Sequence, residues 1–403
     1  MARAGWKKPE TETRLSDLVS VGLLTRVFPP GVVDEVIAEC GRTELRNRSL
    51  PARTMAYFAV GLALHSDSSY EDVLGLMTDG LSWAGSSSAL VKLPSKSAIF
   101  QARDRLGAAP VKALFDRVAQ PLGTEATSGV WLAGRRLVAI DGTTFDVADT
   151  VDNDEFFGRP GTAKGERSAF PQARLVALAE CGTHAIFDAE LGAYTTSEVA
   201  LSKALIDRLQ PGTVVLADRG FCGFDLWKRA AATGADLLWR AKTNTTPRCI
   251  ETFEDGSWLG ELRANNSRLK TEHVVVRVVD YVVDDGRGDP SGPYRLFTTI
   301  TDPSEASATD LAAAYAQRWE IESMFDELKT HQRGSKIVLR SKSPALVQQE
   351  IWGHLCCHYA IRTLMFEAAN AADVDPDRVS FVAALRITRR SLSQARGFSP
   401  SGQ

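Results

Sequence analysis

The chain of 403 residues exceeds the length at which a single hydrophobic core usually suffices, so we expect about two or three domains. With 44% hydrophobic and 24% charged residues it has the composition of a globular protein, and a formal net charge of −3 excludes a uniformly basic nucleic-acid-binding protein. Any contact with nucleic acid must therefore rest on local basic patches.

No membrane or secretory segment is predicted. The longest apolar run, MAYFAVGLAL from Met55, is too short to cross a bilayer, and the opening MARAGWKKPE lacks an apolar signal core. The six cysteines include no C-x2-C pair, which argues against a disulfide framework and against a common zinc ribbon. We therefore expect a cytoplasmic protein with reduced thiols and no membrane contact.

Residues 1–130 have mostly helical periodicity, with turn signals at FPPG, HSDSS and LPSKS, and we predict a helical N-terminal domain there. Within it, LPSKSAIFQARDRLG begins with a serine cap and follows the helical SYEDVLGLMTDGL, an order compatible with a helix-turn-helix. In that case Arg103 and Arg105 would contact DNA. An ordinary surface helix with solvated cations fits the same pattern equally well.

From Arg135 the pattern changes to strands. RRLVAIDGTTFDV is a β-branched apolar run, QARLVALAECGTHAIFDAEL has the pattern of a hairpin that turns at Cys181-Gly182-Thr183, and GTVVLADRGF is a short buried strand that ends in Asp218. Helical stretches follow both of the later strands. Alternating strands and helices of this kind predict a mixed α/β sheet in residues 131–236.

The remainder of the chain divides into three parts. Residues 237–300 contain period-two stretches such as HVVVRVVDYVV and almost no helical spacing, which predicts a β-rich insertion. Residues 301–370 return to helical spacing, with a helix expected to start near Ser304 after TDPSEAS. Residues 371–403 are predicted to form a helical C-terminal tail.

The stretch YAQRWEIESMFDELKTH places four polar side chains on one face when it is wound as an α-helix: Tyr315, Arg318, Glu322 and Lys329. An apolar arc adjoins this face, so the helix would pack on that side and hold a carboxylate at the edge of a cleft. Taken alone, Arg318 and Glu322 could equally form a surface ion pair, because they are four residues apart.

Three acidic residues are candidates for one site: Asp141 and Asp218 at predicted strand ends, and Glu322 on the helix face. In a mixed sheet, active sites collect beyond strand ends, so the three carboxylates could converge on one point. Clustered carboxylates repel one another, and divalent cations such as Mg²⁺ or Mn²⁺ would relieve that repulsion. Two such ions would support in-line attack on phosphorus, which points to phosphodiester cleavage and transfer.

The order Y-x2-R-x3-E-x6-K, preceded by IDGTTFD and LADRGF, resembles the signature of bacterial insertion-sequence transposases of the DDE class, in the family named after insertion sequence four. The resemblance covers nearly the whole chain, including YEDVLGLM and PSKSAIFQARDRLG near the N-terminus. It implies a ribonuclease-H-like catalytic core that is interrupted by the β-rich insertion and preceded by a helical DNA-binding domain.

The resemblance also implies roles for individual residues. The catalytic and metal-binding triad would be Asp141, Asp218 and Glu322, which would bind two Mg²⁺ or Mn²⁺ ions. The motif register selects Glu322 over Asp326, which lies on nearly the same face, whereas Glu320 faces away. The residues that would contact DNA are Tyr315, Arg318 and Lys329 at phosphates, Trp319 on a flipped base, and Arg159, Lys164 and Arg167 of the loop FGRPGTAKGERSAF.

Two of these features have an ordinary structural alternative. A tryptophan beside an apolar arc, as Trp319 is, packs in a core about as often as it serves as a stacking platform. The stretch HLCCH puts His354 and His358 four residues apart with two thiols between them, which could be half of a zinc site. Without a second ligand pair nearby, packing of Cys356 and Cys357 inside a helix is the simpler expectation.

We therefore predict a bacterial, nucleoid-associated transposase that binds the terminal inverted repeats of its element as a homodimer on double-stranded DNA, cleaves the ends and transfers them to target DNA. The family resemblance suggests that excision passes through a DNA hairpin, but no individual residue of the chain points to this intermediate. The alternatives are a transposase-derived DNA-binding regulator that does not cleave, and a metal-dependent nuclease without strand transfer.

Overall fold

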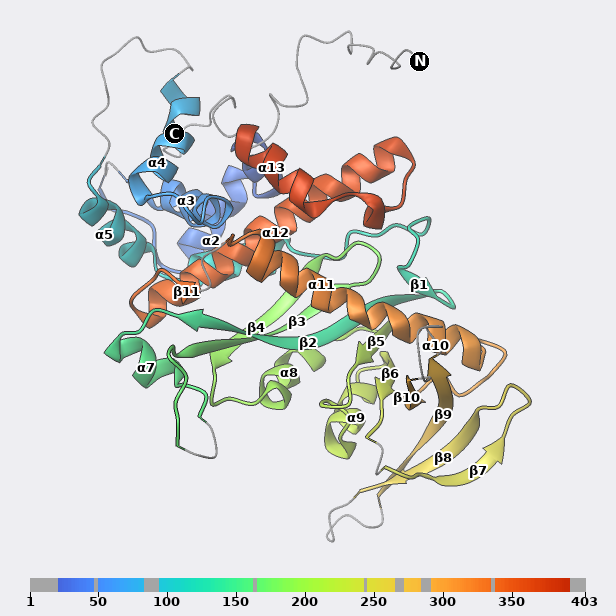
Figure 1. Ribbon diagram of the computed structural model, residues 1–403. Helices are drawn as coiled ribbons and strands as arrows, with labels where there is room; N and C mark the ends of the chain where they lie inside the picture. Colours follow the sequence, from blue (N-terminus) through green and yellow to red (C-terminus); the bar gives the residue numbers. More distant parts are fainter. Residues whose placement is uncertain are drawn as a thin grey trace.

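The computed structural model describes residues 21–391 apart from 47–49, 83–93, 162–164, 243–244, 265–271, 284–290 and 335–337 (Figure 1). Within these residues one large mixed sheet has the strand order β4-β3-β2-β5-β6-β10-β9-β8-β7, and two short strands, β1 and β11, also pair with β2. The strands are β1 (Trp131–Leu132), β2 (Arg135–Val147), β3 (Gln172–Glu180), β4 (Ile186–Ala193), β5 (Thr213–Ala217), β6 (Asp236–Arg240), β7 (Arg248–Thr252), β8 (Trp258–Arg263), β9 (His273–Val283), β10 (Ser291–Thr298) and β11 (Val338–Leu339).

Along this order the pairing of neighbouring strands changes from antiparallel to parallel and back to antiparallel. Strands β4, β3 and β2 are antiparallel, β2, β5 and β6 are parallel, and β10 returns antiparallel to β6. The predicted mixed α/β architecture and the hairpin of β3 and β4 are therefore confirmed. The β-rich segment after β6 continues the same sheet as an antiparallel meander, and β7 at its edge is exposed along its whole length.

Helices cover both faces of the sheet, in agreement with the period-two alternation of β2 (Figure 1). Val138 and Ile140 point to one face, where they pack in a core with side chains of α8 and α9. Leu137 and Ala139 point to the other face, in a core shared with α11 and α12. The helices beside the sheet are α7 (Val151–Phe157), α8 (Glu198–Ile206), α9 (Phe224–Ala231), α10 (Ala308–Ala316), α11 (Glu320–Asp326) and α12 (Pro344–Ala372), and α13 (Phe381–Ser391) packs against α12.

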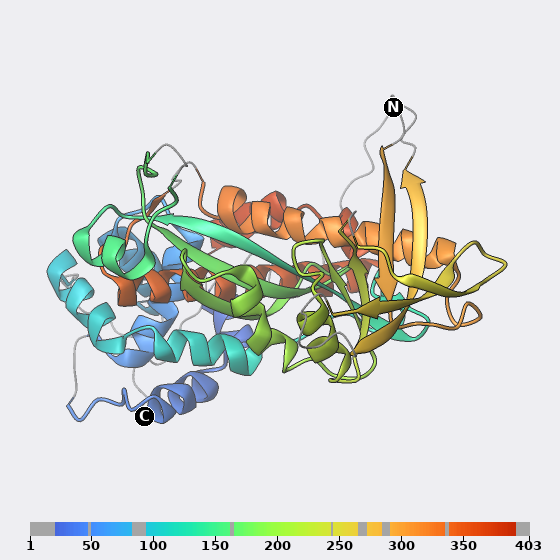
Figure 2. The same cartoon turned by 90° about the horizontal axis from the view of Figure 1, so that it is seen from below.

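The predicted N-terminal helices are present, and they share a core with α12. They are α1 (Val21–Val27), α2 (Pro30–Glu39), α3 (Ala52–Leu64), α4 (Tyr70–Ser82), α5 (Lys96–Leu106) and α6 (Ala109–Val118). Gly353, in the middle of α12, lets α3 approach closely, because a Cβ atom there would lie 2.5 Å from the carbonyl oxygen of Ala59. Figures 1 and 2 show these helices at one end of the sheet and β7 to β10 at the other.

The polar motif lies on a segment that is not one uniform α-helix. Residues 308–331, which we call the motif segment, comprise α10, a 3₁₀ turn at Gln317–Trp319, α11 and a π-helical turn at Glu327–His331. The helix predicted to start near Ser304, after TDPSEAS, begins directly after this stretch at Ala308, and Ser307 caps it in a capping box with Asp310. None of the helices formed by the described residues is long and apolar enough to span a membrane.

Candidate active site

Asp141 and Asp218 occupy matching positions on neighbouring parallel strands. In the register of β2 and β5, Ile140 pairs with Ala217, so the two aspartates are the next residues on each strand. Because strand side chains alternate, they face the α11 side of the sheet, as Ala139 and Leu216 do two residues earlier. Asp141 was predicted to lie at the end of a strand, and this is wrong. Strand β2 continues past Asp141 to Val147, where it pairs with β3 after β5 has ended.

The surroundings of Asp141 leave its negative charge poorly compensated. The pKa of the Asp141 carboxyl is raised to about 6, mainly by burial and also by the nearby carboxylates of Asp218 and Glu198. The opposing contributions come from the Gly142 amide, which donates to Asp141 Oδ1 at 2.8 Å, and from Arg318. A carboxyl group held in this way would gain from a cation.

Glu322 reaches the same place from α11, and Arg318 lies between it and Asp141. Arg318 Nη1 is 3.3 Å from Asp141 Oδ2, and Nη2 is 3.1 Å from Glu322 Oε1. The Arg318 guanidinium is not a surface group, since the residue is only 5% exposed. The pair of Arg318 and Glu322 is thus more than a surface ion pair, because the arginine also binds the strand that carries Asp141.

A cleft of about 430 Å³ lies beside these groups. Lys329 projects into it from the π-helical turn and donates from Nζ to Thr143 Oγ1 at 3.2 Å. Burial lowers the pKa of Lys329. Asp326 lines the same cleft and pairs with His331 at 3.3 Å, so lining the cleft does not distinguish Asp326 from Glu322. What distinguishes them is the contact that Glu322 makes with Arg318.

Tyr315 and Trp319 have opposite environments. Tyr315 is 3% exposed, and its hydroxyl donates to the carbonyl oxygen of Ala217 at 3.3 Å, so it ties the motif segment to the end of β5. This buried contact with β5 argues against the predicted contact of Tyr315 with a phosphate. Trp319 is 51% exposed, with the Arg318 guanidinium 4.5 Å from its ring centroid. The core alternative for Trp319 is therefore excluded.

A second depression lies beside Trp319. This Trp319 hollow has a volume of about 640 Å³ and lies between the motif segment and the start of α13. The residues that line it are Trp319, Glu322, Ser323, Asp326, Glu327, His331, Ser380, Phe381 and Val382. Glu322 borders both the cleft and the hollow, so an exposed aromatic ring and the candidate catalytic glutamate share one concave surface.

Arg103 is buried, which overturns its predicted contact with DNA. Its exposed fraction is 0%, its Nε donates to Gln349 Oε1 at 2.9 Å, and its guanidinium lies 5.2 Å from the ring centroid of Tyr70. It therefore joins α5 to α4 and α12. Helical spacing alone could not separate a solvated arginine from one that links helices. Arg105 is partly exposed and pairs with Glu44 at 3.4 Å.

Two arginines of the basic loop after α7 pair with acids in and before α7. Arg159 pairs with Asp149 and, at 2.9 Å, with Asp154, while Arg167 is exposed and reaches the same Asp154 at 3.1 Å. Lys164 lies outside the described residues. The structure does not bring Arg159 to Asp141; it holds this arginine against the acids of α7 and the preceding turn.

The HLCCH stretch does not form a metal site. His354 Nδ1 contacts Gln332, His358 Nε2 contacts Glu327 at 3.1 Å, and Cys356 donates to a backbone carbonyl of α6. The expected packing of both cysteines in a helix is confirmed by their burial in α12. In the described part of the chain, one group of three residues has ligand atoms within 4.8 Å of one another, and it consists of His184, Glu320 and Asp377.

The comparison with known families decides the identity of the chain. Residues 132–360, more than half of its length, match the family model described as the transposase DDE domain. The chain is a DDE transposase of the insertion sequence four family. Residues 18–116 of this transposase also match the model for the N-terminal region of insertion element 4 transposases. The predicted family and enzymatic activity are confirmed: DDE transposases cleave and join DNA with divalent metal ions.

Three known proteins are similar to this transposase in sequence or in structure. The transposase InsG of insertion sequence element IS4 from Escherichia coli K12 is 28% identical over 385 residues, covering 92% of this transposase and 83% of the relative. A putative transposase of the same strain, InsZ, is 28% identical over 252 residues, covering 58% and 80%. A structure of the piggyBac transposase synaptic complex with hairpin DNA aligns with 12% identity and a TM-score of 0.47 over 94% and 82% of the two chains.

Sequence reasoning missed His184 and Asp377, which meet Glu320 beside the motif segment. Glu320 was expected to face away from Glu322, and it does. No spacing in the sequence signals this group, because its three members come from a hairpin turn, the motif segment and the connection between α12 and α13. Only the folded chain brings them together.

Proposed function

We propose that Asp141, Asp218 and Glu322 are the catalytic carboxylates with which this transposase cleaves the ends of its element. The observation that carries the proposal is the register of β2 and β5, which sets the two aspartates side by side on the face covered by the motif segment. The contacts of Arg318 with Asp141 and Glu322 bring the third carboxylate to the same place.

We further propose that β2 to β6 form a ribonuclease-H-like core. The order β4-β3-β2-β5-β6, with three antiparallel strands followed by two parallel ones and helices on both faces, supports this assignment. The sequence predicted residues 131–236 and 301–370 as the two parts of the core and 237–300 as the insertion. Because β6 (Asp236–Arg240) pairs in parallel with β5, the first part of the core in this scheme extends to Arg240 and the insertion begins after it. Residues 1–130 would be the DNA-binding region and 371–403 the tail.

The carboxylates suit two Mg²⁺ or Mn²⁺ ions. Their oxygens are hard ligands of the kind that these ions prefer, and the raised pKa of Asp141 reports negative charge in need of a counterion. Bound ions would activate the attacking oxygen and stabilise the leaving one. Asp141, Asp218 and Glu322 would hold them, and the guanidinium of Arg318 supplies a single positive charge between two of these acids.

Other residues of the motif segment would bind and orient the DNA. Lys329 projects into the cleft, where an ammonium group can contact a phosphate. Arg318 is well placed to orient Asp141 and Glu322 and to meet a phosphate that enters beside them. Tyr315 would act by fixing the motif segment on β5. Trp319 would stack on a base that leaves the duplex at the cleaved end.

Replacing Trp319 with Ala tests the stacking role. Because the ring is half exposed, the free energy of unfolding should fall by less than about 1 kcal/mol, far below the ~3 to 5 kcal/mol lost with a buried tryptophan. Cleavage of the element's ends should slow, since one base stack contributes about 1 to 3 kcal/mol. Denaturant melts and cleavage rates measured together check both statements. A large loss of stability with normal cleavage would contradict them.

The substrate would be double-stranded DNA with terminal inverted repeats, bound by a homodimer in the bacterial cytoplasm at the nucleoid. The test is to incubate the protein with labelled duplexes that end in the inverted repeats flanking its gene, together with target DNA and Mg²⁺. We expect shortened products and joined products. Cleavage without joining would favour a nuclease, and binding without cleavage would favour a regulator. A duplex with scrambled ends is the matched control.

A further inference from the structure

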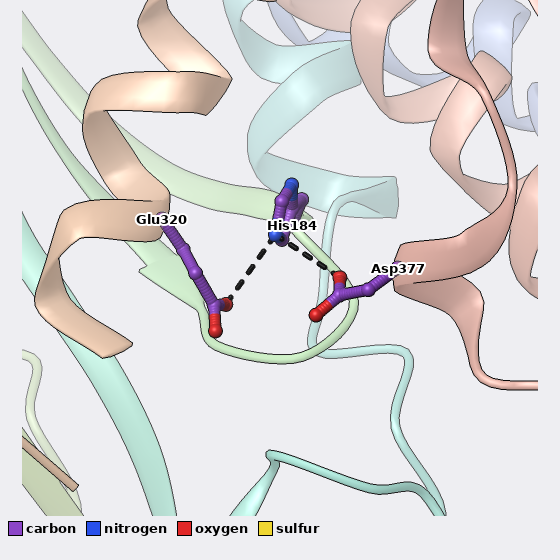
Figure 3. A group of neighbouring side chains, drawn as sticks. All are labelled: His184, Glu320 and Asp377. Atoms are coloured by element: carbon purple, nitrogen blue, oxygen red, sulfur yellow. Dashed lines mark ion pairs between the residues drawn. The ribbon is translucent and has the colours of Figure 1, made fainter. Parts of the chain in front are cut away.

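His184, Glu320 and Asp377 join three segments that are distant in the sequence, and we call them the His184 clasp (Figure 3). His184 Nε2 lies 3.1 Å from Asp377 Oδ1 and 3.4 Å from Glu320 Oε2. His184 belongs to the turn between β3 and β4, Glu320 begins α11, and Asp377 lies in the 3₁₀ turn between α12 and α13. Figure 3 shows the ring between the two carboxylates.

The surroundings of the clasp fix the ring and Glu320 in place. Glu320 Oε2 also accepts the Gly182 amide at 2.7 Å, and Arg362 lies 2.7 Å from Nδ1 of His184 on the opposite side of the ring. His184 has a φ of +59°, an uncommon value for a residue with a side chain. The turn thus adopts a conformation that costs free energy and that directs the ring to the two acids.

An ion-pairing role fits the clasp better than a metal site. Arg362 can only donate, so its contact with Nδ1 belongs to the neutral ring, in which the hydrogen is on Nε2. Burial lowers the pKa of His184, but Asp377 and Glu320 outweigh burial and raise it to about 9, so Nε2 also keeps its hydrogen in the charged ring. A metal ion would have to displace that hydrogen.

The clasp connects the two walls of the Trp319 hollow. One wall is formed by the motif segment, in which Glu320 follows Trp319 in the sequence and precedes Glu322, and both of these neighbours line the hollow. The other wall is formed by Ser380 and the first residues of α13. Asp377 lies three residues before Ser380, in the preceding 3₁₀ turn. His184 touches both walls and belongs to neither, so its ring sets the spacing between them.

We propose that the His184 clasp is a positioning device that holds the Trp319 hollow at the width a displaced base requires and keeps Glu322 oriented towards the scissile phosphate. This inference rests on the proposed function. Its members are positioning residues, because none of them lines the cleft in which Asp141 and Glu322 lie. Loss of the clasp should leave DNA binding intact and slow the steps that follow it.

The test is a double-mutant cycle with Asp377→Ala and His184→Asn, since asparagine tolerates a positive φ. At saturating inverted-repeat DNA and Mg²⁺, each single variant should cleave about ten-fold more slowly, a loss in the range expected from small misplacements of reacting groups. The double variant should be no slower than the worse single one, because both changes break one device. The affinity for DNA should change by less than about two-fold.

A second readout separates positioning from general damage. With 2-aminopurine placed at the end of the transferred strand, the fluorescence rise that reports base unstacking should be smaller in both single variants and unchanged in Arg378→Ala. Arg378 is the matched control, because it is an exposed side chain in the same turn as Asp377. If His184→Asn fails to fold, Glu320→Ala takes its place in the cycle.

Several results would overturn the clasp. These are parental cleavage and fluorescence in Asp377→Ala, single-variant losses that multiply in the double variant, and Zn²⁺ or Mn²⁺ binding that Asp377→Ala abolishes without affecting cleavage. Absence of cleavage by the parent protein would instead count against the proposed function, so the two failures are distinguishable.

Discussion

Glu322→Gln should abolish cleavage of the element's ends and leave binding to them intact. The substitution keeps the volume of the side chain and removes the negative charge that would help to hold a cation beside Asp141. Metal ions supply several kcal/mol of transition-state stabilisation, and about 1.4 kcal/mol corresponds to ten-fold in rate, so the loss should be on the order of a hundred-fold or more. Single-turnover cleavage and a filter-binding assay measure the two effects.

The control for this substitution must lie away from the site. Glu320→Gln is unsuitable, although Glu320 faces away from Glu322, because Glu320 accepts the Gly182 amide and pairs with His184. Glu367, on α12, forms an exposed ion pair with Arg26 of α1. Glu367→Gln removes one negative charge there, as Glu322→Gln does at the site, and should behave like the parent protein. Cleavage that survives in Glu322→Gln and fails in Asp326→Asn would assign the metal to the carboxylate one turn later.

Glu327→Ala should cause the largest loss of stability among the acidic residues of the motif segment. Glu327 is buried beside α12, where its Oε2 lies 3.0 Å from Arg362 Nε and 3.1 Å from His358 Nε2. Removing it leaves the Arg362 charge without its main partner in the interior, which typically costs about 3 to 5 kcal/mol. Urea melts measure the change, and Glu367→Ala at the exposed pair should cost less than about 1 kcal/mol.

The pH dependence of that loss provides a further check. Burial raises the pKa of Glu327, but His358 and Arg362 outweigh burial and lower it from 4.5 to about 2. A carboxyl with a lowered pKa stabilises the folded state fully above its unfolded value and loses this contribution as the pH falls towards the folded value. The difference in unfolding free energy between parent and Glu327→Ala should therefore shrink between about pH 5 and pH 2. A difference that stays constant over this range would exclude the ionised pair as its cause.

The parts of the site that follow from local periodicity could be predicted from the sequence. Strand alternation and motif order identified Asp141 and Asp218, and helical spacing placed Arg318 with Glu322. Burial could not be predicted in the same way, because it depends on which element packs over a face. Tyr315 was therefore assigned to DNA although it supports the sheet contact of the motif segment, while the exposure of Trp319 stayed open.

Long-range and irregular features were also beyond sequence reasoning. The clasp depends on the meeting of a hairpin turn with a 3₁₀ turn almost two hundred residues later, and no pattern within either segment requires it. The 3₁₀ and π-helical turns of the motif segment change the angle between successive residues, and a uniform 100° step cannot represent them. Lys329 still reaches the cleft, because the π-helical turn brings its Nζ atom within hydrogen-bonding distance of Thr143 on β2.

The close approach of α3 to α12 at Gly353 has a consequence for how the protein can be dissected. The apolar side of α3 is covered by a helix from the far end of the chain, so a fragment that stops near residue 130 would expose that side to water and lose its folded shape. The N-terminal helices and the catalytic sheet therefore form one cooperative unit. Cutting the chain between them should therefore unfold the N-terminal helices instead of releasing them as a separate domain.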